Sequence, residues 1–564
     1  MSNLSGADII IHSLEKLGVQ YVSGIPGGAN LPLYDALNKS SIKHVLARHE
    51  QGAGFIAHGI ARSTDKVGVC LASSGPGATN LITAIADAKM DSVPIVAITG
   101  QVPLSMVGTD AFQEIDTYGL TIPITKHNYF VRDADELTRI IPEAFAIAKS
   151  GRPGPVAIDV PKDIQLQKVK NNSTNGKKPL FGINGRETKE KPDNYTNQIA
   201  QILEMIHRAK KPLLYIGGGV IHSHSSDLIR EIARKNSIPV TSTLMGLGGF
   251  PYNDSLYLGM IGMHGLPFTN YILDEVDLLL AFGVRFDDRA TGKVQEFCKN
   301  AAIVHVDIDG SEINKIKTSD VFINGDLHCT LKEMALLLES DTRSEWMCRV
   351  NHLKKEHPWV LPPAWDLFHP INIIRKIAEL AGEDTIITTD VGQHQMWVAQ
   401  AYPLMKPKTF ITSGGLGTMG FGLPTSIGVA LANPDKRVIC FTGDGSIMMN
   451  IQELATLNEM NLNITIVVLN NYGLGLVRQQ QEFFYKQNYF ASEFITKFNF
   501  ADIGRAFGIK SFQLQQVSEP IKTLHSSLQD DGPCMIDISI LSNENVFPMV
   551  PPGFANRDMI GGKK

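Results

Sequence analysis

The 564-residue sequence lacks the features that mark secreted, membrane-spanning and nucleic-acid-binding proteins. No apolar run approaches the roughly 18 residues that a membrane-spanning helix needs. The N-terminal stretch has neither the basic start and cleavage site of a signal peptide nor the Arg-rich, acid-poor character of a transit peptide. A net charge of −5 without a basic stripe argues against nucleic acid as a partner. We therefore expect a cytoplasmic protein with no membrane and no nucleic-acid partner.

Cysteine is also scarce, and its spacing forms neither a CxxC pair nor a short disulfide framework. The six residues are Cys70, Cys298, Cys329, Cys348, Cys440 and Cys534. This pattern predicts reduced thiols rather than disulfides or a cysteine metal site. The length itself predicts three or four domains, each able to bury a core.

The most informative stretch lies near the C-terminus. An apolar strand is predicted over 438–442, a Gly-Asp-Gly turn follows at 443–445, and apolar residues at helical spacing cover 448–460. A second apolar strand is predicted over 464–469. A strand, a crossover helix and a second strand in one sheet imply parallel pairing with a right-handed connection. Both strands therefore end at the same edge of the sheet.

Oxygen-bearing side chains meet at that edge. Asp444 follows the first strand, while Asn470 and Asn471 follow the second. A carboxylate, an amide oxygen and the carbonyl of Gly473 suit Mg²⁺, which takes its other ligands from phosphate and water. The helix N-terminus after Ser446 also favours phosphate. Gly-Asp-Gly alone would indicate only a tight turn, but with Asn-Asn at this spacing we interpret it as a metal-held diphosphate site.

Short apolar strands alternate with helices along the whole chain, which predicts an α/β fold of three doubly wound parallel-sheet domains. The predicted division is residues 1–165, a polar linker at 166–196, residues 197–340, a second connection at 341–368, and residues 369–564. The further strands that we expect are 21–23, 45–47, 67–72, 95–99, 156–159, 213–216, 278–282, 303–307 and 385–390.

Residues 69–100 repeat the layout of the C-terminal stretch, with Ser-Gly-Pro-Gly in place of Thr-Gly-Asp-Gly. Pro76 occupies the position of Asp444, so we expect this copy not to bind the metal. What the N-terminal module offers instead is Glu50, at a predicted strand-to-helix junction. Taken alone, an acid in the first turn of a helix needs no chemical role, because the helix dipole favours it.

The Gly-Asp-Gly, helix and Asn-Asn pattern resembles the thiamin diphosphate motif. Over its whole length the chain is similar to the acetohydroxyacid synthase (acetolactate synthase) large, catalytic subunit, of the biosynthetic isozyme I type. The motifs that carry this resemblance are PGGAN at 26–30, SGPGATN at 74–80, GTDAFQEID at 108–116, RPGPVAIDVPKDIQ at 152–165, GMIGMHG at 259–265, RFDDRATGK at 285–293, VGQHQMW at 391–397 and VFPMVPPG at 546–553.

The resemblance implies three cofactors, thiamin diphosphate, Mg²⁺ and FAD, the last with a structural role. It implies that pyruvate is decarboxylated and its two-carbon unit passed to a second 2-ketoacid. Pyruvate as acceptor gives 2-acetolactate and 2-ketobutyrate gives 2-aceto-2-hydroxybutyrate, in the first common step of branched-chain amino acid biosynthesis. In such a protein Glu50 promotes deprotonation of the coenzyme.

The resemblance also assigns site residues. Gln113 and Lys162 line the active site, although such side chains on a surface are usually only solvated. Arg289 offers a bidentate fork to the carboxylate of the second ketoacid, where the alternative is a surface ion pair. Gln480 stands where most relatives have a Trp, which predicts little preference for 2-ketobutyrate over pyruvate.

The remaining assignments concern cofactor binding. Asp444, Asn471 and the Gly473 carbonyl hold the metal. The other cofactor-binding positions are Gly28, Glu50, Pro76, Asn80, Gly392, Gln393, His394, Gly417, Met419, Gly443, Gly445 and Ser446. The FAD positions are Gly217, Gly218, Gly219, Met263, His264, Gly283, Arg285, Asp307 and Ile308. Without the resemblance, Gly217 to Gly219 would be only a weak nucleotide turn, because GxGxxG is absent.

Two other functions remain open on the sequence alone. One is a flavin-dependent pyruvate oxidase, and the other is a non-catalytic protein that only binds thiamin diphosphate or flavin. Intact Glu50, Asp444 and Asn471 argue against the second. The resemblance further implies a homodimer or dimer of dimers, with the coenzyme between subunits, and a small regulatory subunit.

Overall fold

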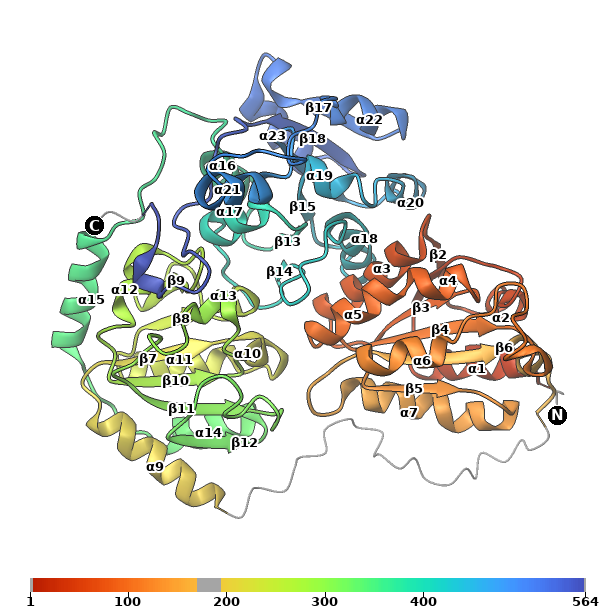
Figure 1. Ribbon diagram of the computed structural model, residues 1–564, viewed down its shortest axis with the longest axis horizontal. Coiled ribbons are helices and arrows are strands. Elements are labelled where there is room, and N and C mark those ends of the chain that lie inside the picture. Colours follow the sequence, from red (N-terminus) through yellow and green to blue (C-terminus); the bar gives the residue numbers. More distant parts are fainter. Residues whose placement is uncertain (1–3, 170–193, 562–564) are drawn as a thin grey trace.

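The computed structural model of the protein describes residues 4–169 and 194–561, which contain three six-stranded sheets (Figure 1). Every paired strand in them is parallel to its neighbour, and helices cover the sheets. The predicted α/β fold of three doubly wound parallel sheets is thus confirmed. Within the described ranges, no helix has both the length and the apolar character needed to cross a bilayer.

The N-terminal sheet has the strand order β2-β1-β3-β4-β6-β5. Its strands are β1 Tyr21–Gly24, β2 Lys43–Leu46, β3 Gly68–Ala72, β4 Ile95–Gln101, β5 His127–Phe130 and β6 Val156–Pro161. Its helices are α1 Gly6–Lys16, α2 Leu31–Leu37, α3 Glu50–Ser63, α4 Pro76–Asn80, α5 Ile82–Met90, α6 Thr117–Thr121, α7 Leu137–Lys149 and α8 Lys162–Leu166. Strands β3, β4 and β6 are buried throughout, as expected for strands covered on both faces.

The middle sheet has the order β12-β11-β10-β7-β8-β9. Its strands are β7 Pro212–Ile216, β8 Val240–Ser242, β9 Tyr257–Met260, β10 Leu278–Phe282, β11 Ala302–Asp307 and β12 Val321–Asn324. Its helices are α9 Tyr195–Arg208, α10 Gly218–His222, α11 Ser226–Lys235, α12 Pro267–Ile272, α13 Asp288–Thr291, α14 Leu327–Leu337 and α15 Ser344–Glu356. The strand order reverses between β7 and β10, and ligands of such sheets bind at this switch point.

The C-terminal sheet has the order β14-β13-β15-β16-β18-β17. Its strands are β13 Ile386–Thr389, β14 Phe410–Ile411, β15 Val438–Gly443, β16 Ile464–Asn470, β17 Lys510–Gln513 and β18 Cys534–Ser539. Its helices are α16 Pro370–Ala381, α17 Gln393–Ala401, α18 Gly422–Ala432, α19 Asp444–Ile447, α20 Glu453–Met460, α21 Gly475–Phe484, α22 Phe500–Ala506 and α23 Pro520–Gln529. Numbered from its first strand, this order equals that of the N-terminal sheet, so the predicted internal repeat is confirmed.

The two related modules meet through α3 and α18, which cross at a pair of glycines. A Cβ added to Gly428 would lie 1.9 Å from the carbonyl oxygen of Ile56, and one added to Gly59 would lie 2.1 Å from that of Thr425. Only glycine permits backbones to approach this closely. One hydrophobic core therefore continues across both modules, from the N-terminal sheet through α3 and α18 into the C-terminal sheet.

Several elements differ from the sequence-based expectations. The predicted helix over 448–460 is broken, because the buried Asn450 side chain donates to the carbonyl of Gly420 instead of facing solvent. The helix before it begins at Asp444, not after Ser446. The predicted connection 341–368 contains α15, whose apolar face packs on the middle domain. Most of the predicted linker 166–196 lies outside the described residues.

The strands that the sequence analysis missed are β5, β8, β9, β12, β14, β17 and β18. Most of them are short or lie at a sheet edge, where an apolar run of ordinary length is not required. Strand β18 is central, but Asp537 interrupts its apolar pattern. This carboxylate is buried and accepts hydrogen bonds from Asn470 Nδ2 and the Phe500 N–H. In the sequence, a buried acid whose hydrogen bonds are satisfied cannot be distinguished from an acid that faces solvent.

Candidate active site

The ends of β15 and β16 bring Asp444 beside Asn471. The two strands pair in parallel with Gly443 opposite Leu469, so the residues that follow each strand emerge together. Tyr472 has φ of 60°, in the left-handed region, and this turn folds Gly473 back toward the carboxylate. The Gly473 N–H then donates to Asp444 Oδ2 at 2.8 Å.

Three oxygen atoms converge in this turn. Asn471 donates its amide N–H to Gln393 Oε1 at 3.0 Å, which turns the amide oxygen toward the other two ligands. That terminal atom lies 3.1 Å from Asp444 Oδ1 and 2.9 Å from the Gly473 carbonyl oxygen. Octahedral Mg²⁺ holds oxygens at about 2.0–2.1 Å, so neighbouring ligands stand about 2.8–3.0 Å apart. The spacing fits one face of such an octahedron.

Electrostatics at Asp444 also favour a bound cation. The side chain is buried, and burial raises the pKa of its carboxyl to about 7 despite hydrogen bonds from backbone N–H groups. A buried carboxylate is stable in its charged form only when positive charge lies close to it. Within residues 4–169 and 194–561 no three His, Cys, Asp or Glu side chains gather as a metal site. A cation beside Asp444 would therefore take its other protein ligands from Asn471 and the Gly473 carbonyl.

Asn470, the other amide of the pair, serves a different purpose. Its Nδ2 donates to the Phe498 carbonyl and to Asp537, inside the sheet. The sequence placed both asparagines beside Asp444, but only Asn471 faces it.

The turn after β13 lies against the turn after β15. Gly392 ends the first of these turns as the N-cap of α17, and a Cβ added to Gly443 would lie 2.8 Å from His394 Nδ1. The His394 ring is wholly buried, which lowers its pKa to about 3, and its Nε2 atom has no hydrogen-bond partner. A diphosphate oxygen would supply that partner. Ser446 Oγ is already engaged, since it donates to the Val391 carbonyl at 2.6 Å.

The N-terminal module gathers a second group of predicted residues. Glu50 is the first residue of α3, and Asn80 Nδ2 donates to its Oε2 at 2.9 Å. Gly77 lies beneath the carboxylate, where an added Cβ would come within 3.3 Å of Oε1. Gly75 packs against the backbone of Gln113, which itself has φ of 61°. A glutamine held in the left-handed region is strained, as side chains at functional sites often are.

Three other predicted residues lie at the edges of these groups. Pro76 begins α4, immediately after Gly75, and is the structural counterpart of Asp444. Lys162 begins α8 directly after β6. Gly28 follows β1, and open space surrounds the position that its Cβ would take.

The FAD assignments come together around one large cavity of about 1070 Å³. All nine predicted positions line it: Gly217, Gly218, Gly219, Met263, His264, Gly283, Arg285, Asp307 and Ile308. The cavity lies at the switch point between β7 and β10. There an added Cβ on Gly219 would meet the Gly283 Cα at 2.5 Å, so both turns need glycine. This is the position and backbone geometry of a dinucleotide site.

The same cavity continues toward the C-terminal module. Arg289, Gly417 and Gln480 also line it, together with Leu476 and Met549. Arg289 is largely exposed, and its ion pair with the adjacent Asp288 is long, at 3.7 Å. Its guanidinium is therefore available for an anionic ligand.

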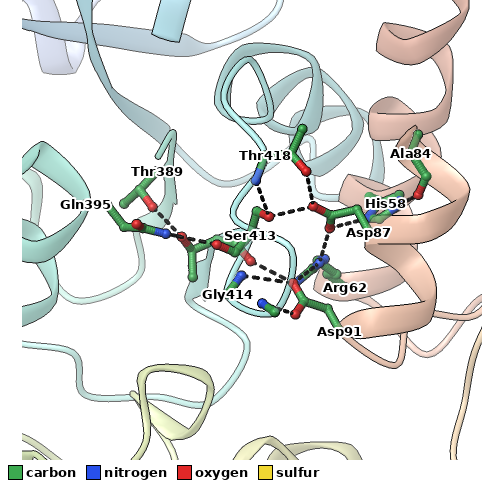
Figure 2. Close-up of polar contacts among 12 residues, drawn as sticks. His58, Arg62, Ala84, Asp87, Asp91, Thr389, Gln395, Ser413, Gly414 and Thr418 are labelled. Carbon is green, nitrogen blue, oxygen red and sulfur yellow. Dashed lines mark hydrogen bonds and ion pairs between the residues drawn. The ribbon is translucent and has the colours of Figure 1, made fainter. Parts of the chain in front are cut away.

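The loop that carries Gly417 and Met419 is held by the N-terminal module (Figure 2). Asp91 accepts hydrogen bonds from the N–H groups of Gly414 and Gly415, at 3.0 and 2.6 Å. Asp87, on the same helix, accepts from the Ser413 hydroxyl and from Thr418 Oγ1.

Arg62 pairs with both acids, and burial together with the nearby Asp91 raises the pKa of Asp87 to about 6. The sequence analysis missed this cluster. The sequence signal for the cluster was two acids four residues apart, one within α5 and one at its C-cap, a spacing that places both on one face of the helix.

Comparisons with known proteins agree with this arrangement. Residues 4–120 match the N-terminal TPP binding domain of thiamine pyrophosphate enzymes, residues 199–334 match their central domain, and residues 390–538 match their C-terminal TPP binding domain. Each match contains one of the three sheets or most of it. The three domains of thiamine pyrophosphate enzymes are therefore present, in that order, within residues 4–538.

Relatives extend the match to full length. The chain is 52% identical to the acetolactate synthase isozyme 1 large subunit of Escherichia coli, over 99% of this chain and 98% of that one. It is 43% identical to the isozyme 2 large subunit of the same organism, over 99% of both chains. It is 45% identical to the chloroplastic acetolactate synthase of Arabidopsis thaliana, over 98% of this chain and 84% of the relative. The chain therefore belongs to the thiamine pyrophosphate enzymes and, among them, to the acetolactate synthase large subunits.

Proposed function

We propose that this protein is the catalytic subunit that joins pyruvate to a second 2-ketoacid, with thiamin diphosphate, Mg²⁺ and FAD as cofactors. The observation that carries the proposal is the convergence of the Asp444, Asn471 and Gly473 oxygens beside the unpartnered His394 Nε2. When bound, the coenzyme supplies the electron sink for loss of CO₂ from pyruvate and transfer of the two-carbon unit. Asp444, Asn471 and Gly473 would hold its metal, and Gln393 and His394 would contact its diphosphate.

Glu50 is the proposed acid and base. Asn80 occupies its Oε2, which leaves Oε1 to share a proton with the pyrimidine ring of the coenzyme. Met419 is proposed to support the bent coenzyme, and Gln113 and Lys162 to line the substrate space.

Acceptor choice is proposed to lie in the large cavity. Arg289 would bind the carboxylate of the second ketoacid with two parallel hydrogen bonds. Gln480 lines the same cavity and offers no aromatic surface to an extra methyl group. We therefore propose 2-acetolactate as the main product when pyruvate is abundant. The FAD positions would hold a flavin whose role is structural.

The assembly is also proposed. Relatives are named large subunits, which implies a small regulatory partner for them. We extend this partner to the present chain and propose a homodimer as the minimal catalytic unit, because the family resemblance places the coenzyme between the Glu50 module of one subunit and the Asp444 module of its mate. An active monomer in solution would contradict the dimer.

One experiment separates this function from its rivals. The purified protein is incubated with pyruvate, thiamin diphosphate, Mg²⁺ and FAD, and acetolactate, acetate and oxygen are measured. Acetolactate without oxygen consumption supports the proposal. Oxygen-dependent formation of acetate or acetyl phosphate would indicate a pyruvate oxidase. If no pyruvate is consumed, the protein is non-catalytic.

A further inference from the structure

A chain of buried amides connects the C-terminal tail to the metal-facing side chain of Asn471. Its first member is the backbone of Val546, and the next two are the side chains of Gln479, on α21, and Gln393, on α17. The side chains of Gln479, Gln393 and Asn471 are all buried, and that of Gln479 is wholly inaccessible to solvent. Each contact is a hydrogen bond of 2.9 or 3.0 Å.

The direction of every bond is fixed by the first. The Val546 N–H can only donate, and it donates to Gln479 Oε1 at 2.9 Å. Gln479 Nε2 then faces the Val546 carbonyl, to which it donates at 2.9 Å. Because Gln479 Oε1 is an acceptor, the atom of Gln393 that meets it must be Nε2, at 2.9 Å.

The second half of the chain follows from the first. Gln393 Nε2 also donates to the carbonyl of Glu544, so both of its acceptors agree on its orientation. Gln393 Oε1 must therefore accept, and Asn471 Nδ2 donates to it at 3.0 Å. The remaining atom of that amide, the oxygen, has to face Asp444 and the Gly473 carbonyl.

The opposite orientation of Asn471 would suit an empty site better. With its nitrogen turned inward, the amide would donate to Asp444 Oδ1 and to the Gly473 carbonyl at 3.1 and 2.9 Å. A cation would then have to break two hydrogen bonds and rotate the amide before it could bind. Holding the oxygen inward removes that cost, as outer groups around metal ligands commonly do.

We propose that Gln479 is a positioning residue for the metal site, which fixes the Asn471 amide with its oxygen toward Mg²⁺ through Gln393. The inference rests on the proposed function, because it assumes that a divalent cation binds Asp444, Asn471 and Gly473. Gly475 leaves space for the hydrogen bond between Gln393 and Asn471. An added Cβ there would lie 2.0 Å from Gln393 Oε1 and 2.4 Å from Asn471 Nδ2.

The test compares two substitutions at one position. Gln479→Met keeps the volume but offers Val546 and Gln393 only a weakly accepting sulfur, so Gln393 and Asn471 are no longer held in one orientation. Gln479→Glu, protonated in its buried site, keeps an acceptor for both and a hydroxyl for the Val546 carbonyl. Mn²⁺ binding is titrated by electron paramagnetic resonance on the full chain with thiamin diphosphate and FAD and without substrate.

Gln479→Met is expected to weaken Mn²⁺ binding about 10-fold, the lower value for outer-shell changes, while Gln479→Glu stays within about threefold of wild type. The matched control is Gln400→Met. Gln400 is a buried glutamine on the same helix as Gln393, and it bonds to the same tail through the Phe547 carbonyl, but it has no link to Asn471. Its loss is expected to lower the unfolding temperature and leave Mn²⁺ affinity unchanged.

Equal affinities for wild type and Gln479→Met would overturn the inference, as would an equal loss in Gln479→Glu and Gln479→Met. If Gln479→Met does not fold, Gly475→Ala disturbs the Gln393 to Asn471 bond directly and is expected to weaken Mn²⁺ binding at least as much. Unchanged affinity in that variant would also overturn it. Failure of the wild type to bind Mn²⁺ with thiamin diphosphate would instead refute the proposed metal site.

Discussion

The N-terminal and C-terminal modules share one architecture and differ in the chemistry of one turn. Both sheets have the same strand order, and in both a central strand leads through a Gly-X-Gly turn into a short helix. The residue between the glycines is Pro76 in one module and Asp444 in the other. The edge that opposes it also differs. Gln101, at the end of β4, bonds to Asp159 and the Ile115 carbonyl, while Asn471, after β16, faces Asp444.

The contact between the modules is reciprocal. Asp91 of the N-terminal module accepts N–H groups from the loop before α18, and Glu453 of the C-terminal module accepts those of Arg48 and His49, just before α3. Each module therefore holds the segment that leads into the other's crossing helix. The comparison teaches that the fold and the interface can stay symmetric while two side chains give only the C-terminal module the proposed cation site.

The largest expected effect comes from removing the acid that distinguishes the modules. Asp444→Ala deletes a direct metal ligand and is expected to weaken Mg²⁺ binding by at least about 100-fold, the upper value for changes one shell further out. Titration of Mg²⁺ at saturating thiamin diphosphate measures this, and high coenzyme concentrations should restore part of the activity. Wild-type metal affinity in this variant would remove the main difference between the modules.

The N-terminal module should show a different kind of loss. Glu50→Gln keeps the hydrogen bond from Asn80 possible but removes the ionisable group, so coenzyme deprotonation should slow by roughly 100-fold or more. Exchange of the thiazolium C2 proton measures the step, and Mg²⁺ affinity serves as the control that should not change. A fully active variant would show that Glu50 does not have the proposed role.

The contact between the two modules is tested where α3 and α18 cross, at Gly59 and Gly428. Gly428→Ala and Gly59→Ala each place a methyl group about 2 Å from a carbonyl oxygen and should each cost about 1–3 kcal/mol of unfolding free energy. Because both substitutions separate the same two helices, their effects in the double variant should not add. Chemical denaturation measures all three. Unequal single costs with strict additivity would mean that the two glycines are not partners.

Helix α21, which follows Gly473, carries the residue of the C-terminal module that is proposed to select the acceptor. Gln480→Trp should raise the preference for 2-ketobutyrate over pyruvate about 10-fold, the lower part of what one methyl group is worth in an apolar pocket. Competition between the two ketoacids at equal concentration, with both products quantified, measures the ratio. An unchanged ratio, or a wild-type ratio that strongly favours acetohydroxybutyrate, would refute the role of Gln480.

The smallest effect is expected from copying the acid into the other module. Pro76→Asp should not create a second metal site, because the amide of Gln101, at the end of the neighbouring strand β4, is already bonded to Asp159 and to the Ile115 carbonyl. Metal analysis at saturating Mg²⁺ should still give one ion per chain. A second bound ion would show that the turn alone, rather than turn and facing amide together, makes the site.

The sequence predicted the parts of the site that depend on local order along the chain. Strand ends, the Gly-Asp-Gly turn and the distance to Asn471 were enough to predict that Asp444, Asn471 and Gly473 lie together. It also predicted the internal repeat, since the same order of strand, turn and helix recurs. It misplaced Asn470 because a facing direction depends on Asp537, a partner in a strand that the apolar pattern did not reveal.

What could not be predicted depends on contacts between distant segments. The hydrogen bonds from the loop before α18 to Asp87 and Asp91 join residues that are more than 320 positions apart in the sequence. Neither segment contains a pattern that predicts contact with the other. Gln479 lies beside Gln480 in a run of three glutamines, and the sequence does not show that one is buried and the other exposed. Its partner is a backbone N–H, which every residue except proline possesses.

The bond from Val546 to Gln479 places a timing constraint on the biosynthesis of this protein. All three proposed metal ligands are translated before residue 474, yet the group proposed to orient one of them is made more than 70 residues later. Domains generally fold as the chain emerges, the N-terminal ones first. Strands β15 and β16 of a nascent chain can therefore pair beside Asp444 before any group fixes the orientation of the Asn471 amide. The proposed metal site is thus fully oriented only after the C-terminal tail has been made. A chain truncated before Val546 would contain Asp444, Asn471 and Gly473 but would lack the group that orients the Asn471 amide.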